Sequence, residues 1–509
     1  MEIESHPLAS EAACHQSICE ALTFSLRLPH HSSPPAIEAT MKGFDFIVVG
    51  GSPSAVTMAH RLSSSSSRPS VLHLQAGHGQ RPDGTAPAVD PCSWSQPLMS
   101  TPQVHLGGRT LSLAAGYALG GASTSEAYLD AWADSVGDAS YRDSGKAARS
   151  EPQHVFAGHT KLPNLTVDCL SQPDKIIFDG KKAIAISTSN GTVHASKEIV
   201  LCAGALRTPQ LLLLSGIGPR DHLAALGIPL VCDLPIGKAL KDSLVIPVLW
   251  EVGPALTGSA DWLFDPETMR AHIRQFLNLE TNLGKDNPSP LPIVSGQSDA
   301  VLDSKDIPAL PPRSQDFVRH PATSHWEFCV LPTGGSPNTS RRLLQINAYP
   351  QVVCSTGSLQ LASKDAAEPL LVDPNYLSQA IDRHNAVDAV RIVTRFFTVL
   401  ASLSNDMLGP HSAPASDEEA DVLAFIRESA ATARHYSGAT PMGRRQDEEA
   451  CVDGDFCVLG VAGLRVADVS VTPLLPVICS QVTPNVLGSI LVERLIKKHN
   501  LEEAGPLGA

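Results

Sequence analysis

The stretch from Phe44 to Gly79 constrains the fold of this chain most strongly. Phe44 to Val49 is a short apolar run with β-branched residues, which predicts a buried parallel strand. Two glycines interrupt it, Ala55 to Leu62 then carries apolar residues at helical spacing, and a second apolar run follows at Val71 to Leu74. This order predicts a βαβ unit, whose first turn places a helix N-terminus where a dinucleotide pyrophosphate can bind.

The first turn retains only part of the dinucleotide-binding pattern. The three glycine positions of G-x-G-x-x-G fall on Gly50, Ser52 and Ala55, so one glycine remains. Ser52 adds a Cβ where the backbone would approach a phosphate, and Pro53 removes a backbone N–H donor. Gln75 stands where the second strand usually ends in a ribose-binding acid. By itself, the turn fits a nucleotide site and a plain α/β unit equally well.

Length and composition indicate a globular protein of two or more domains. The chain has 509 residues, of which 43% are hydrophobic and 18% charged. A net charge of −14 argues against nucleic acid and anionic membranes as partners. No apolar run is long enough to span a membrane. The eleven cysteines are scattered without metal-ligand spacing, so we expect free thiols in a reducing compartment and no metal site.

Two further stretches contain glycines in positions that suit a ligand. The cluster Gly120 to Ser123 offers small residues and backbone donors, although a simple glycine-rich turn would read the same. The run Lys197 to Ala203 predicts a buried strand that leads into Gly204 and a helix over Gln210 to Ser215. This order again predicts a helix N-terminus that can hold an anion or a cofactor.

The remaining pattern predicts a β-meander and a second, α+β part. Strands are expected within Asn164 to His194, where an Asn-Gly pair marks a hairpin turn. Helices are clearest at Thr268 to Leu277, Asp382 to Leu400 and Leu487 to His499. The Pro/Ser/Asp-rich stretch Asp286 to Arg319 predicts a surface loop.

The stretch Gly204 to Gly218, GALRTPQLLLLSGIG, resembles the second signature of the glucose-methanol-choline (GMC) oxidoreductases, which are FAD-dependent alcohol oxidases and dehydrogenases. The similarity extends from about Phe44 to Lys498 and is closest in style to fungal pathway members. The other matching segments, in order, are Gly227 to Asp242, Ser355 to Ser363, Val372 to Leu377, His435 to Gly443 and Gly463 to Pro473.

The resemblance implies an α/β fold with a discontinuous Rossmann-like FAD-binding domain and an α+β substrate domain that contains a mixed or antiparallel sheet. The implied division is a disordered extension over 1–40, an FAD-binding part over 41–244 with the meander at 164–194, a substrate domain over 245–430, a return to the FAD domain over 431–500, and a tail over 501–509. The extension lacks the basic start of a signal peptide, and Met41 is a plausible alternative start, so we expect a cytoplasmic protein.

The resemblance also implies the site residues. The cofactor-binding positions are Gly50, Gly51, Ser52, Gln75, Gly121, Ala122, Ser123, Ala203, Gly204, Asp468, Val469, Pro484 and Asn485. The first residue of the family's catalytic pair maps onto His435, and the second, counted back from Glu493, onto Thr483.

The chemistry of these groups agrees with alcohol oxidation. An alcohol must lose its hydroxyl proton as its α-hydride moves to the flavin, and a neutral imidazole suits the role of base. Thr483 cannot act as a base at neutral pH, but its hydroxyl can hydrogen-bond. The implied partners are a small organic alcohol, such as a secondary-metabolite intermediate, and O2 or another oxidant as electron acceptor. Outside its motif, His435 would read as an ordinary loop histidine.

Two more departures from the family pattern affect the cofactor site. Glu126 replaces a usual asparagine near the flavin, and only 41 positions separate Ser123 from Asn164, where the family has a longer segment that covers the flavin. A missing exon would also explain the short segment. We expect weaker FAD retention than is usual in the family. An alcohol-oxidising enzyme, a flavin-containing lyase or cyclase without net redox chemistry, and an inactive relative all stay open.

Overall fold

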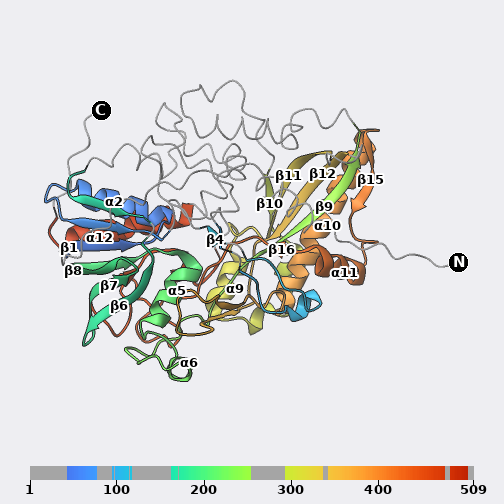
Figure 1. The fold of residues 1–509 in the computed structure, drawn as a ribbon. Helices are drawn as coiled ribbons and strands as arrows, with labels where there is room; N and C mark the ends of the chain where they lie inside the picture. Colours follow the sequence, from blue (N-terminus) through green and yellow to red (C-terminus); the bar gives the residue numbers. More distant parts are fainter. Residues whose placement is uncertain are drawn as a thin grey trace, which may run out of the picture.

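The computed structural model describes residues 43–76, 95–96, 98–113, 115–116, 162–169, 171–253, 293–335, 342–475 and 482–501. The predicted extension over 1–40, the helix at 268–277, the cluster Gly121–Ser123 and the tail beyond Leu501 lie outside these residues. Two sheets dominate the part described, one on the left and one on the right of Figure 1. The predicted α/β class is confirmed.

The first sheet has seven strands in the order β5-β2-β1-β8-β7-β6, and β17 also pairs with β8. β5, β2, β1, β8 and β17 run parallel, whereas β6, β7 and the first half of β8 form an antiparallel meander. The strands are β1 (Gly43–Val49), β2 (Val71–Leu74), β5 (Leu165–Asp168), β6 (Pro173–Asp179), β7 (Lys182–Thr188), β8 (Gly191–Leu201) and β17 (Leu464–Val466).

The sequence pattern explains the centre of this sheet. Residues 46–49 of β1 are completely buried, as a continuous apolar run in a parallel strand requires. Helices α2 (Pro53–Ser64) and α12 (Val482–Lys498) lie side by side along the sheet in Figure 1. Helix α5 (Gly204–Leu214) packs against β6. The predicted βαβ unit is therefore confirmed.

Several element boundaries differ from the prediction, among them that of helix α5, which begins at Gly204 rather than Gln210. β5 is a parallel partner of β2 at the sheet edge, so it does not belong to the meander expected over 164–194. β8 is one strand that joins the hairpin to the parallel sheet. Helix α12 begins at Val482 rather than Leu487, because Pro484 is tolerated in a first helical turn. Thr483, Pro484 and Asn485 are therefore helical.

The second sheet is antiparallel, in the order β10-β11-β12-β9-β15, and β16 also pairs with β9. Helix α10 (Ala380–Leu403) covers one face, where Phe397 stacks on Trp250 with ring centroids 4.9 Å apart. Helix α11 (Glu419–Ser429) packs beside α10. The strands are β9 (Leu244–Val252), β10 (Ile293–Gly296), β11 (Trp326–Gly335), β12 (Arg342–Pro350), β15 (Met407–Ser412) and β16 (Ala431–Thr432).

The loop predicted over Asp286 to Arg319 is wrong for its described part. Residues 293–319 contain β10, the short helices α8 (Asp299–Leu302) and η6 (Ile307–Ala309), and α9 (Pro312–Arg319). Val301, Ile307 and Val318 form a small separate core, so a few apolar residues order a stretch of polar composition. The other short elements are β3 (Ser95–Gln96), η2 (Val104–Leu106), β4 (Ala115–Gly116), α6 (Arg220–Ala225), β13 (Ser358–Gln360), β14 (Leu371–Asp373) and η7 (Val469–Val471).

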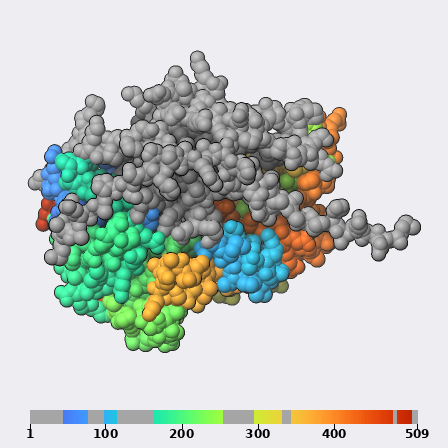
Figure 2. All heavy atoms as spheres, in the orientation of Figure 1, coloured from blue at the N-terminus to red at the C-terminus, as the bar shows by residue number. Residues whose placement is uncertain are grey.

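The segment 98–113 lies on the surface beside the C-terminal part of the chain, as Figure 2 shows in cyan and orange-red. Arg109 Nη1 donates to the backbone oxygen of Arg427 at 2.7 Å, and Thr101 N donates to the oxygen of Val372 at 2.8 Å. Among the described residues, the seven cysteines are free thiols and no cluster of potential metal ligands occurs. None of the described helices could cross a membrane.

Candidate active site

Four of the predicted cofactor residues follow strands of the first sheet and lie at one edge of it. Because β1, β2, β8 and β17 are parallel, their carboxyl ends share that edge. Gly50 follows β1, Gln75 follows β2, Ala203 follows β8 and Asp468 follows β17. β1 lies between β2 and β8, so the chain crosses over in both directions from it. Such a switch point is where doubly wound sheets bind ligands.

The turn after β1 packs closely against the residue that follows β8. Gly50 has φ +119°, and a Cβ there would lie 2.3 Å from the backbone oxygen of Cys202, so this glycine is required by the neighbouring strand. Ser52 caps α2, with its Oγ accepting from Ala55 N at a long 3.4 Å. The N-terminus of this twelve-residue helix fits a pyrophosphate, with the donor at Pro53 missing.

The second predicted anion seat, at the start of α5, is occupied by a carboxylate of the protein itself. Asp468 Oδ2 accepts from Gly204 N at 2.9 Å and from Thr208 Oγ1 at 2.5 Å, while its Oδ1 accepts from Ser470 N at 2.9 Å. Burial raises the pKa of Asp468. Its side chain therefore joins β17 to the helix that follows β8, and the donors at this helix end are satisfied within the protein.

Helix α12 packs closely against α2. A Cβ on Gly488 would lie 2.8 Å from Ser54 Cα, so a glycine permits this approach. Asn485 Oδ1 accepts from Thr57 Oγ1 at 3.2 Å, and Pro484 is buried. The side chain of Asn485 thus contacts α2. Sequence reasoning missed Gly488, although a glycine inside a predicted helix is a known signal of close packing.

His435 lies in the loop after β16, with its side chain half-buried. Its Nδ1 is 3.2 Å from Ser243 Oγ, and its backbone N donates to Asp242 Oδ1 at 2.8 Å. Burial lowers the pKa of His435 to about 4, so the imidazole is neutral at pH 7. The ring therefore has the protonation state that a base requires.

Asp242 organises the loop of His435 and was missed as a site residue. Besides His435 N, its carboxylate accepts from the hydroxyl of Thr432 at 2.5 Å and from the hydroxyl of Tyr376. Burial raises its pKa to about 6. Asp242 is the last residue of the family-like segment that begins at Gly227. Its place in that segment was the sequence signal that could have identified it as a site residue.

The loop of His435 continues to the edge that carries the cofactor residues. Thr440 N donates to the backbone oxygen of Ser470 at 2.9 Å, and Gly438 N donates to that of Val469 at 3.4 Å. Val469 begins η7, directly after Asp468. The fold therefore brings the chain of His435 together with the residues that follow β17.

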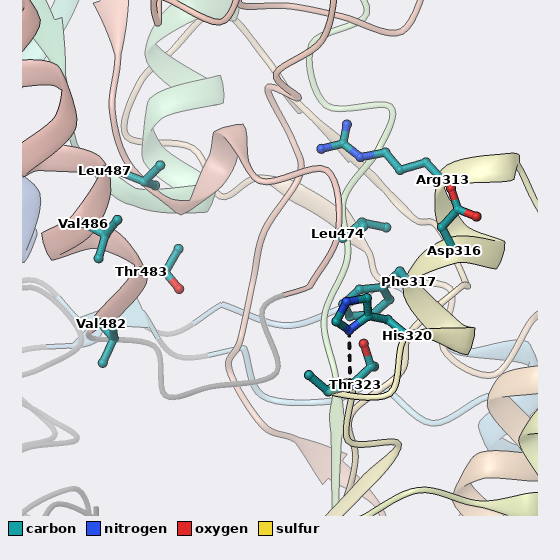
Figure 3. Close-up of a pocket in the computed structure, with 11 residues that line it drawn as sticks. Arg313, Asp316, Phe317, His320, Thr323, Leu474, Val482, Thr483, Val486 and Leu487 are labelled. Carbon is teal, nitrogen blue, oxygen red and sulfur yellow. Dashed lines mark hydrogen bonds between the residues drawn. The ribbon is translucent and has the colours of Figure 1, made fainter. Parts of the chain in front are cut away.

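Thr483, the second predicted catalytic residue, lies in the first turn of α12. It lines a cavity of about 620 Å³ between α12 and α9, with Val486 and Leu487 on one wall and Phe317 and His320 on the other (Figure 3). The described lining of this cavity does not include His435. The structure thus does not place the two predicted catalytic residues in one cavity wall, and Gly121, Ala122 and Ser123 lie outside the described residues.

Two sequence models of one family match the chain. The C-terminal GMC oxidoreductase model matches residues 354–488 and the N-terminal model matches residues 137–245. An oxygen-dependent choline dehydrogenase of Pectobacterium carotovorum is 32% identical over 319 residues, which are 61% of this chain and 53% of that protein. The chain thus spans about half the length of this relative. Versicolorin B synthase of Aspergillus parasiticus is 26% identical over 85% of each protein.

The fold is shared with solved structures. A formate oxidase superposes with a TM-score of 0.73 at 17% identity, covering 90% of this chain and 99% of the other. A fungal aryl-alcohol oxidase superposes with a TM-score of 0.69 at 20% identity, covering 90% and 99%. The two family models, in agreement with the ordered motifs, show that the chain belongs to the GMC oxidoreductases, a family of FAD-dependent enzymes.

Proposed function

We propose that this protein is an FAD-dependent oxidoreductase that oxidises the CH–OH group of a small organic alcohol, with His435 as base. The observation that carries the proposal is the placement of a neutral, hydrogen-bonded imidazole on a loop that adjoins the cofactor edge of the parallel sheet. Members of the family that the chain resembles include alcohol-oxidising enzymes. A cytoplasmic location and O2 or another oxidant as electron acceptor belong to the same proposal.

The described residues fit the dinucleotide part of FAD. Gly50, Gly51 and Ser52 would hold the pyrophosphate at the start of α2, and Gln75 would bond the ribose. Residues near Ala203 would line the next position along the edge. When bound, the flavin supplies the hydride acceptor that none of the side chains can provide. Residues 245–430, which include most of the antiparallel sheet, are proposed to form the substrate domain.

The side chains provide proton handling. The alcohol carbon loses a hydride and its hydroxyl loses a proton, so the product is a carbonyl compound. Nε2 of His435 accepts the proton, and the resulting imidazolium must release it to solvent before the next turnover. Because burial lowers the pKa of His435 to about 4, loss of this proton to solvent is thermodynamically favourable at neutral pH. Thr483 is proposed to hydrogen-bond the substrate oxygen from the first turn of α12.

A second function has support of its own. Thr483 offers no base at the second catalytic position, and the relative that covers 85% of both proteins is named versicolorin B synthase. A lyase or cyclase that keeps a flavin without net redox chemistry needs an acid/base histidine only. This alternative predicts turnover of substrate while the flavin stays oxidised.

The experiment is anaerobic reduction of the purified, FAD-loaded protein by a panel of primary and secondary alcohols. The ultraviolet–visible spectrum is recorded before and after FAD addition and gel filtration. We expect flavin bands that stay with the protein and that bleach with at least one alcohol, but not in His435→Asn. Absence of flavin at excess FAD refutes the proposal. Turnover without bleaching establishes the second function.

A further inference from the structure

Ser243 is the hydrogen-bonding partner of the His435 ring among the described residues. Its Oγ lies 3.2 Å from Nδ1, and its side chain is buried, with 1% of the residue exposed. The bond joins residues 192 positions apart in the sequence. Because Nδ1 is engaged, Nε2 is the nitrogen that is left for a substrate.

The backbone holds Ser243 at a fixed distance from the histidine loop. Ala433 N donates to the backbone oxygen of Ser243 at 2.9 Å. The preceding Lys241 exchanges two backbone hydrogen bonds with Ser437, at 3.0 and 2.9 Å. These bonds flank His435 on both sides. The Ser243 hydroxyl is therefore placed against Nδ1 by a short two-stranded ladder.

A buried carboxylate anchors the same unit. Asp242 accepts from the backbone N of His435, and its neighbour Lys241 reaches the backbone oxygens of Val353, Cys354 and Ser355 at 3.3 to 3.4 Å. The segment 241–243 is thus tied to two other parts of the chain. Movement of Ser243 away from the ring would break several of these contacts together.

The chemistry of the pair decides what Ser243 can do. A neutral imidazole carries one N–H, so Nε2 is a free base only while Nδ1 holds the proton. A buried Nδ1–H needs an acceptor, and the serine oxygen is the acceptor within reach. Since a hydroxyl has no charge, it orients the ring without stabilising the imidazolium as strongly as a carboxylate would.

We infer that Ser243 is a positioning residue that accepts the Nδ1–H of His435 and so keeps Nε2 unprotonated for the substrate. This inference rests on the proposed function for its catalytic consequence. The ring geometry and the tautomer do not depend on turnover. They can therefore be measured separately.

The first measurement is the tautomer of His435 in the full-length protein labelled with [15N]histidine. The signal is assigned by its loss in His435→Asn. We expect Nδ1 to be protonated in the wild-type protein at pH 7, with and without FAD. A wild-type ring protonated at Nε2 overturns the inference, and this result requires no Ser243 variant to fold.

The second measurement compares Ser243→Ala with Ser437→Ala, a matched control. Ser437 lies two residues from His435, is equally buried, and its hydroxyl has no partner among the described atoms. In Ser243→Ala we expect a mixed tautomer and a rate constant of flavin reduction lowered by about tenfold or more, with KM unchanged. Ser243→Thr keeps the hydroxyl and should recover most of the rate.

The outcomes separate the two proposals. If Ser243→Ala reduces the flavin as fast as Ser437→Ala and its His435 tautomer is unchanged, Ser243 is not a positioning residue, although alcohol oxidation stands. If no alcohol reduces the wild-type flavin, the proposed function fails, and the tautomer measurement still decides the role of Ser243.

Discussion

Glu198 provides the sharpest test of what holds the C-terminal helix on the sheet. The side chain of this glutamate of β8 is 2% exposed and contacts three basic side chains: Arg465 on β17 at 2.5 Å, Lys498 at 2.9 Å and His499 at 2.6 Å. Lys498 ends α12, so the cluster joins that helix to two parallel strands. Glu198→Gln keeps the shape of the side chain and removes its charge.

The magnitude follows from the protonation equilibrium. Burial raises the pKa of Glu198, but hydrogen bonds from Arg465, Lys498 and His499 lower it more, so the result is a fall from 4.5 to about 2. This difference corresponds to about 3 kcal/mol of stability for the ionised form. Because the folded-state pKa is the lower one, the contribution is complete above about pH 4.5 and disappears as the pH falls towards 2.

We therefore expect Glu198→Gln to lower the free energy of unfolding by about 3 kcal/mol at pH 7, since it also leaves the buried Arg465 without its counter-charge. The assay is urea unfolding followed by tryptophan fluorescence, with refolding checked. The matched control is Glu493→Gln on the same helix, whose ion pair with Arg61 is 3.4 Å long and whose side chain is 62% exposed. Glu493→Gln should lower the free energy of unfolding by less than about 1 kcal/mol.

Two results would refute this reasoning. One is an equal, small loss of stability in Glu198→Gln and Glu493→Gln at pH 7. The other is a difference between wild type and Glu198→Gln that stays constant from pH 6 to pH 3.5, where the protonation argument requires it to shrink.

Three further predictions concern the site and its support. His435→Asn should lower the rate of flavin reduction by at least about 100-fold. Because burial lowers the pKa of His435 to about 4, the wild-type rate of flavin reduction should be constant above about pH 5 and fall at lower pH. A fall centred near pH 7 would contradict this. Gly488→Ala should lower the free energy of unfolding by about 1–3 kcal/mol, because its Cβ would lie 2.8 Å from Ser54 Cα. Gly43→Ala has open space around it and should lower the free energy of unfolding by less than about 0.5 kcal/mol. Equal unfolding midpoints for the two variants would exclude the packing argument. FAD binding, measured by fluorescence titration, should be weaker than is usual in the family, with a larger dissociation constant, because the segment after Ser123 is short. Tight retention of FAD would show that the short segment does not weaken cofactor binding.

Local pattern determined the elements around the first turn. The apolar run that became β1, the helical spacing of α2 and the short strand β2 were all predicted within one or two residues. The reason is that a buried strand and an amphipathic helix require hydrophobic residues at fixed spacing, whatever the rest of the chain does. The ordered motifs also sufficed to predict the family.

The prediction failed where distant segments decide the structure. The position of β5 depends on pairing with β2, and a strand's own residues do not specify its neighbour. The polar composition of residues 293–319 predicted a loop, but contacts among Val301, Ile307 and Val318 give this segment helices and a core.

The sequence by itself determined the α/β class, the βαβ opening, the family and the candidate base His435. Only the tertiary structure decided that Asp468 fills the start of α5, that Asp242 and Ser243 hold His435, and that Glu198 fixes α12. The hydrogen bond from His435 N to Asp242 joins residues 193 positions apart, and that from Gly204 N to Asp468 joins residues 264 positions apart. Such contacts leave no periodic trace in the sequence, because each depends on one pair of groups that meet only when distant segments have folded together.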